Sequence, residues 1–154
     1  AGIHDVSFKD SNRHRAACDV FTVNVIAAVR ITECVMENMI KNQYGRIVNV
    51  SSIGAKYGSD AESCFYGASK SALETITKSH ARLGAGHNVL VNAIRPGVIN
   101  TDFLHSLKKD LDARIKSIPL QRLAEVDEVA NLIYYLCNTN SYMTSDIVTI
   151  SGGD

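Results

Sequence analysis

The stretch "RIVNVSSIGAKYGSDAESCFYGASKSALETITKS" at positions 46–79 joins a short β-branched run, a loop rich in Gly and Ser, and a helix-like segment. The first seven residues are typical of a buried strand. The segment that carries Tyr66 and Lys70 predicts a helix ending at the glycines Gly84 and Gly86. A strand that leads through a loop into a helix is the repeating unit of a parallel α/β sheet.

The same alternation continues on both sides of this stretch. Apolar residues recur at spacings of three and four from about residue 12 to residue 42, which predicts a long amphipathic helix with Gly45 as its C-terminal stop. Downstream, we expect a strand over "NVLVNAI" (88–94), an amphipathic helical segment over 102–118, a helix over "EVANLIYYLCN" (128–138) capped by Asp127, and a strand over "DIVTISGG" (146–153). This alternation predicts that residues 1–154 form one α/β domain whose parallel sheet is covered by helices on both faces.

The composition excludes several classes of function. Lys plus Arg balance Asp plus Glu at 16 each, so nucleic acid and membrane surfaces gain no electrostatic support as partners. No apolar run approaches the roughly 18 residues of a membrane span. Four widely spaced cysteines favour reduced thiols in a cytoplasmic protein, and the five histidines show no metal-ligand spacing.

Tyr66 and Lys70 are four residues apart and share one face of the predicted helix. A nearby ammonium group favours an ionised phenol, so we expect Lys70 to lower the pKa of Tyr66. Such a phenol is usable as a proton donor or acceptor. The first strand ends at Ser51 and Ser52, which brings a hydroxyl to the same edge of the sheet. The alternative is a surface Tyr–Lys pair without chemistry.

Five motifs, in order along the chain, together resemble the short-chain dehydrogenase/reductase family. They are "VNVIAA" with Asn24, "GRIVNVSS" with Ser52, "YGASK" with Tyr66 and Lys70, "VNAIRPGVINT" over 91–101, and the closing "SGG". The resemblance implies a Rossmann-like, doubly wound parallel sheet in three α/β/α layers. The resemblance covers the whole of this chain but only the C-terminal three-fifths or so of a family member. Within the family, the 3-oxoacyl reductases are the branch that this sequence most resembles.

The resemblance also implies roles for individual residues. Tyr66 is expected to be the general acid/base, and Lys70 to lower its pKa and to bind the nicotinamide ribose. Ser52 is expected to orient the substrate oxygen and Asn24 to hold a water that links Lys70 to solvent. Ser51 stays an alternative to Ser52, because the interval from Ser52 to Tyr66 is one residue longer than the family's. The remaining cofactor contacts are expected at Pro96, Gly97, Ile99 and Thr101.

The implied cofactor is NAD or NADP, and the two are not distinguished, because the family's N-terminal, Gly-rich pyrophosphate-binding turn has no counterpart here. We expect an oxidoreductase that transfers a hydride between NAD(P) and a carbonyl or secondary alcohol, as a homodimer or homotetramer. The alternative is a non-catalytic binding or scaffolding fragment. Dependence on a carrier protein is less favoured, because Gln43 and His87 stand where the resemblance implies arginines.

Overall fold

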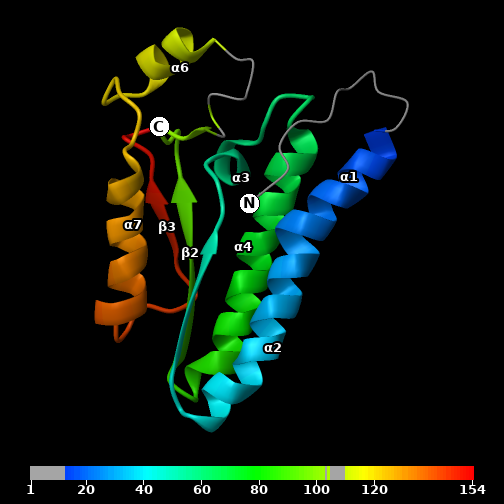
Figure 1. Ribbon diagram of the computed structural model, residues 1–154, viewed down its shortest axis with the longest axis vertical. Helices are drawn as coiled ribbons and strands as arrows, with labels where there is room; N and C mark the ends of the chain where they lie inside the picture. The colour runs from blue at the N-terminus through cyan, green and yellow to red at the C-terminus, as the bar shows by residue number, and fades with distance from the viewer. Residues whose placement is uncertain (1–12, 103, 105–109) are drawn as a thin grey trace.

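The computed structural model describes residues 13–102, 104 and 110–154 (Figure 1). Within these residues one sheet contains three strands in the order β1 (Gly45–Val50), β2 (Val89–Pro96) and β3 (Ile147–Ile150). Both pairs are parallel, with Gly45 opposite Val89 and Ala93 opposite Ile147. The predicted parallel sheet and its three strands are confirmed.

Helices cover both faces of this sheet (Figure 1). On one side lies a continuous helical rod beside a second long helix; on the other lies a shorter helix near the C-terminus. The rod consists of α1 (Arg13–Phe21), the π-helical η1 (Thr22–Ile26) and α2 (Ala27–Lys41), its neighbour is α4 (Cys64–Ala85), and the opposite face carries α7 (Val126–Tyr134) and η2 (Tyr135–Thr139). The α/β/α layers are thus those predicted.

Two short helices lie near the carboxyl ends of the strands. The first, α3 (Gly54–Tyr57), interrupts the predicted loop between β1 and α4. The second, α6 (Leu111–Ser117), is the described part of the helical segment expected over 102–118; residues 103 and 105–109 of that segment lie outside the described residues.

The expected ends of two helices were wrong. The long helix stops at Lys41, and Gln43, with φ of 52°, takes the left-handed position assigned to Gly45. Gly45 instead begins β1, where a Cβ atom would lie 2.5 Å from the Sδ atom of Met39. At α7 the N-cap residue is Glu125 rather than Asp127, and the Glu125 backbone N–H donates to Glu128 Oε2 at 2.8 Å.

Two apolar clusters form the core, one on each face of the sheet. Met36, Ala81, Val89 and Val91 pack between the sheet and the α2–α4 pair. Ile94, Val129 and Leu136 pack between the sheet and α7. Side chains alternate between the faces of a strand, so Val91 and Ile94 of β2 serve different clusters.

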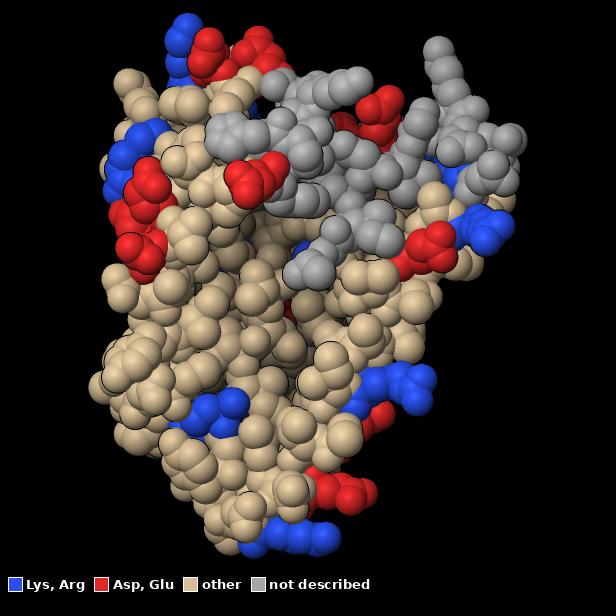
Figure 2. Space-filling model, viewed as in Figure 1, with Lys and Arg blue, Asp and Glu red and all other residues tan. Residues whose placement is uncertain are grey.

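The outer edge of β1 has no strand beside it among the described residues. Val50, at the end of this strand, is 46% exposed. Figure 2, in the same view as Figure 1, shows few charged side chains over the area between α7 and α4. An apolar strand edge of this kind is a surface on which another strand can pair.

Candidate active site

The hydroxyl groups of Ser52 and Tyr66 meet at the carboxyl edge of the sheet. Tyr66 lies in the first turn of α4, and Ser52 follows the end of β1. The two side chains are hydrogen-bonded to each other. The Ser52 Oγ atom also accepts the backbone N–H of Gly54 at 3.2 Å, which fixes its position at the start of α3.

Lys70 lies one turn along α4 from Tyr66, with a side chain that is almost completely buried. Its Nζ atom donates to the Val50 carbonyl oxygen at 2.8 Å and lies 5.7 Å from the centroid of the Tyr66 ring. An ammonium group has three donors, and Val50 O is the one acceptor that the described residues offer it. Two donors therefore remain for hydroxyl groups that enter the site.

The pKa values of this pair differ from the sequence expectation. Burial raises the pKa of Tyr66, and the hydrogen bond from Ser52 opposes this rise. Burial also lowers the pKa of Lys70. The expected lowering of the Tyr66 pKa by Lys70 does not dominate, because the phenol is shielded from water and the ammonium group faces the Val50 carbonyl oxygen.

The structure separates the two candidate serines. Ser51 Oγ donates to Glu74 Oε1 at 2.6 Å and is buried, whereas Ser52 Oγ is beside Tyr66. A hydroxyl held by a carboxylate in the protein interior does not reach a substrate. The arrangement favours Ser52 as the residue that contacts substrate and gives Ser51 a different role.

Asn24 lies inside the π-helical segment of the rod and is buried. Its Nδ2 atom donates to Ser69 Oγ at 3.1 Å, and Ser69 Oγ donates to the Tyr66 carbonyl oxygen at 2.7 Å. The rod thus contacts α4 at the residue next to Lys70. The π-helical turn around Asn24 is of a kind often found at functional sites. That Asn24 holds a water linked to Lys70 stays a prediction.

The predicted cofactor residues lie along the chain that leaves β2. Pro96 ends the strand, and its carbonyl oxygen accepts the N–H of Ile53 at 2.9 Å, close to Ser52. At Gly97 a Cβ atom would lie 2.8 Å from Ser151 Cα, so this glycine permits close approach to the end of β3. Ile99 packs against the apolar cluster under α7, and Thr101 Oγ1 accepts the N–H of Leu104 at 3.3 Å.

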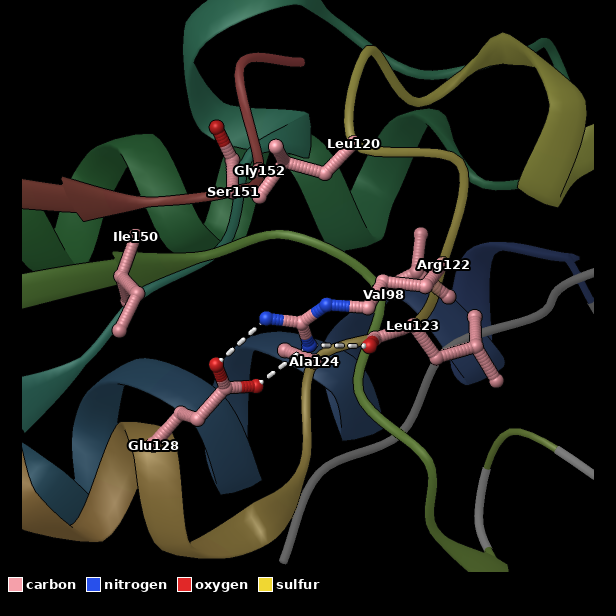
Figure 3. Close-up of a pocket in the computed structure, with 9 residues that line it drawn as sticks. All are labelled: Val98, Leu120, Arg122, Leu123, Ala124, Glu128, Ile150, Ser151 and Gly152. Atoms are coloured by element: carbon pink, nitrogen blue, oxygen red, sulfur yellow. Dashed lines mark hydrogen bonds and ion pairs between the residues drawn. The ribbon is translucent and has the colours of Figure 1, made fainter.

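A separate small cavity of about 100 Å³ lies between the ends of β2 and β3 and the start of α7 (Figure 3). Arg122 and Glu128 form a bidentate ion pair at this cavity, with N–O distances of 2.7 and 2.8 Å. A cavity of this size has room for only a few waters, and none of the candidate residues lines it. Its lining residues are Val98, Leu120, Arg122, Leu123, Ala124, Glu128, Ile150, Ser151 and Gly152.

Sequence reasoning missed the buried polar residues beneath the site. Glu74 lies one turn beyond Lys70 on the face of α4 that packs on the sheet, and it binds both Ser51 and Arg95. The signal was present, because the spacing of Tyr66, Lys70 and Glu74 by four residues places all three on one helix face.

Two further findings concern other kinds of site. No three His, Cys, Asp or Glu side chains in the described part of the chain lie close enough together to bind a metal ion. None of the helices over these residues has the length and apolarity needed to cross a membrane.

Residues 2–154 match a protein-family model described as enoyl-(acyl carrier protein) reductase. The chain is 37% identical over 137 residues to the 3-oxoacyl-[acyl-carrier-protein] reductase FabG of Aquifex aeolicus, covering 88% of this chain and 55% of that protein. It is 33% identical over 153 residues to carbonyl reductase family member 4 of Xenopus laevis, covering 99% of this chain and 63% of that protein.

The fold has close counterparts among solved structures. A short chain dehydrogenase/reductase family protein superposes with a TM-score of 0.88 at 26% sequence identity, covering 99% of this chain and 63% of that one. The chain thus spans a little over half of the length of these proteins. Residues 2–154, which match the family model, contain every motif described above.

Proposed function

Because the chain belongs to the short-chain dehydrogenase/reductase family, we propose that it forms the substrate-binding part of an NAD(P)-dependent reductase of carbonyl compounds. One observation carries the proposal: the Tyr66 and Ser52 hydroxyls meet at the carboxyl edge of the sheet, one helical turn from a buried Lys70. In open α/β sheets this edge is where ligands bind.

The Lys70 ammonium group supports the assignment of a nicotinamide dinucleotide as cofactor. It is buried, and the described residues engage one of its three donors. The vicinal hydroxyls of a ribose match the two remaining donors. Pro96, Gly97, Ile99 and Thr101 are the further residues that we assign to the nicotinamide side, and nothing in the chain selects NAD over NADP.

When bound, the nicotinamide ring supplies the hydride for the carbonyl carbon, or accepts it from the alcohol in the reverse direction. Ser52 donates a hydrogen bond to the carbonyl oxygen and orients it toward Tyr66. Tyr66 then transfers its phenolic proton to that oxygen as negative charge develops there. A raised pKa keeps the phenol protonated at neutral pH, so the Tyr66 of this structure is suited to act as the acid in reduction.

The relatives favour a 3-oxoacyl compound as substrate over an unrelated carbonyl, since the names of several include this activity. At the two positions where the resemblance implies arginines for carrier binding, Gln43 Nε2 and His87 Nδ1 lie 3.0 Å apart and bind each other. We therefore propose a small 3-oxoacyl or related carbonyl substrate, and leave the carrier out of the proposal.

The second candidate is a binding or scaffolding role without catalysis. Four free cysteines support a reducing compartment, and we propose the cytoplasm. We also propose that the protein assembles into homodimers or homotetramers.

The Tyr66→Phe variant of the full-length protein tests the catalytic proposal. Loss of the transferable proton is expected to lower kcat for a 3-oxoacyl ester by about 10² to 10⁴, with little change in fold. Steady-state oxidation of NADH and NADPH measures this. The exposed Tyr142→Phe serves as the control and is expected to have normal turnover. Near-normal turnover by Tyr66→Phe contradicts the role of Tyr66, and absence of turnover by the wild type favours the scaffolding role.

A further inference from the structure

The layer between α4 and the sheet changes from apolar to polar toward the candidate site. At the far end, Ala81 belongs to the apolar cluster with Val89 and Val91. One turn closer, Thr77 Oγ1 accepts a hydrogen bond from Asn49 Nδ2 at 2.8 Å. The next turn carries a charged group, Glu74, and beyond it lie Lys70 and Tyr66.

Three charge-assisted hydrogen bonds hold the carboxylate of Glu74 in this layer. Arg95 Nε donates to Oε1 at 2.9 Å, Arg95 Nη2 donates to Oε2 at 2.6 Å, and Ser51 Oγ donates to Oε1 at 2.6 Å. The side chains of Glu74 and Arg95 are only 9% and 16% exposed. Bonds of this kind are short and directional, so they fix the positions of both partners.

Each partner of Glu74 adjoins a segment of the candidate site. Ser51 is flanked by Ser52, which binds Tyr66, and by Val50, whose carbonyl oxygen accepts from Lys70. Arg95 precedes the Pro96–Gly97 turn, and its Nη1 atom donates to Thr149 Oγ1 of β3 at 3.4 Å. One carboxylate therefore connects the ends of three strands to the helix that carries the proposed acid.

We propose that Glu74 is a positioning residue: through Ser51 it fixes the backbone of Val50–Ser52, and so the placement of the Ser52 hydroxyl against Tyr66 and of the Val50 carbonyl against Lys70. The expected effect of Glu74 on turnover rests on the proposed function. The link from Glu74 through Ser51 to the Ser52–Tyr66 hydrogen bond is independent of that function.

The alternative is that the buried ion pair only stabilises the fold, and a double variant separates the two. Replacing both members of a buried ion pair by apolar residues is commonly neutral or stabilising, whereas removal of one member leaves a buried charge. Glu74→Leu combined with Arg95→Leu is therefore expected to keep the thermal stability of the wild type. It also removes the nearer acceptor of Ser51, Glu74 Oε1 at 2.6 Å, and leaves the Lys70 carbonyl oxygen at 3.4 Å.

The experiment measures two quantities in the full-length protein. Displacement of reacting groups by about 1 Å can cost 10²-fold in rate, so kcat of the double variant is expected to fall about 10- to 100-fold at unchanged melting temperature. Independently of turnover, ultraviolet difference titration of the Tyr66 phenol is expected to show a higher pKa than in the wild type. The hydrogen bond from Ser52 lowers that pKa, and its weakening removes this effect.

Ser51→Ala is the second variant, because it leaves the ion pair in place and removes the hydroxyl that binds Glu74 Oε1 at 2.6 Å and lies 3.4 Å from the Lys70 carbonyl oxygen. It is expected to show the same upward shift of the Tyr66 titration and a decrease of kcat. The control is Glu128→Gln, which removes an exposed carboxylate paired with Arg122 and is expected to change neither quantity. A folded double variant, or Ser51→Ala, with the wild-type titration of Tyr66 overturns the positioning role. If the wild type has no reductase activity and the variants still raise the pKa of Tyr66, the positioning role of Glu74 is supported and the proposed function is rejected.

Discussion

Two arginine–carboxylate pairs in this chain are chemically alike but differ in their surroundings. Glu74–Arg95 is buried beneath the candidate site, and Arg122–Glu128 is largely exposed, with side chains that are 53% and 42% accessible. Exposed pairs contribute little to the free energy of folding because water and salt screen them. At the residue scale, we expect the Glu74–Arg95 pair to affect the geometry of the candidate site, and the Arg122–Glu128 pair to affect how stability depends on pH in acid.

The ion pair with Arg122, together with the hydrogen bond from the backbone of Glu125, lowers the pKa of Glu128 to about 2. A carboxylate whose pKa is lower in the folded state stabilises that state above its unfolded pKa, and loses the effect as pH falls through the folded value. The difference in unfolding free energy between wild type and Glu128→Gln is therefore expected to shrink between about pH 5 and pH 2. Urea denaturation over this range measures the difference, and a difference independent of pH contradicts the assignment.

Much of the candidate site could be predicted at the level of single residues. Tyr66 and Lys70 share a helix face through their spacing, and Ser52 follows a strand end that points to the same edge. The hydrogen bond between Ser51 and Glu74 could not be predicted, because Glu74 approaches from another element. The predicted direction of the Tyr66 pKa shift was wrong, because burial raises this pKa and burial depends on how the whole chain packs.

At the scale of elements, the C-terminal end of α4 packs closely against the start of β2. A Cβ atom added at Gly84 would lie 2.7 Å from the carbonyl oxygen of Val89 and 2.9 Å from its Cβ atom. The backbone of β2 cannot retreat without disturbing its pairing with β1 and β3. The glycine is thus required by close packing, which no periodicity in the sequence indicates.

Gly84→Ala is expected to lower the free energy of unfolding by about 1–3 kcal/mol, the usual cost of overpacking. Gly86 offers a matched control, because it has a helical φ of −66° and no atom within 4 Å of an added Cβ. Gly86→Ala is expected to be neutral or to stabilise by about 0.4–1 kcal/mol. Denaturant titration of both variants measures these changes, and equal effects at the two positions would contradict the packing argument.

The elements themselves were predictable, and their ends less so. Hydrophobic periodicity and β-branched runs located the main helices and strands, because these signals are repeated over many residues. The stop at Gln43, the cap at Glu125 and the π-turn around Asn24 each depend on a single residue in a tertiary context. Local preference decides such positions weakly, and packing overrides it.

At the scale of the whole molecule, the helical rod and α4 both carry exposed apolar side chains. Ile31 on α2 is 66% exposed and Leu83 on α4 is 59% exposed, whereas Leu73 of α4 is buried. A helix with apolar side chains on two sides needs a partner on each. Exposed apolar residues on the rod are Val23, Ile26, Ile31 and Val35.

The full-length protein is therefore expected to be a dimer or tetramer at micromolar concentration, with the rod in an interface. Ile31→Lys combined with Val35→Lys places two charges on this surface and is expected to reduce the mass measured by light scattering. Tyr142→Lys, which replaces a side chain that is 94% exposed outside the helices, is expected to leave the mass unchanged. A stable monomeric wild type contradicts the proposed assembly.

The buried pair of Glu74 and Arg95 also constrains how this sequence can change over evolutionary time. Loss of either member leaves the other charge unpaired in a largely buried layer, where the side chains of Arg95 and Glu74 are 16% and 9% exposed. Breaking a fully buried pair costs about 3–5 kcal/mol, and even part of this is a large share of the roughly 5–15 kcal/mol that stabilises a typical domain. Exchange of both for apolar residues is tolerable, yet every single-step route passes through one of the costly intermediates. A lineage that has acquired the pair is thus held to it, and substitutions at these two positions should occur together.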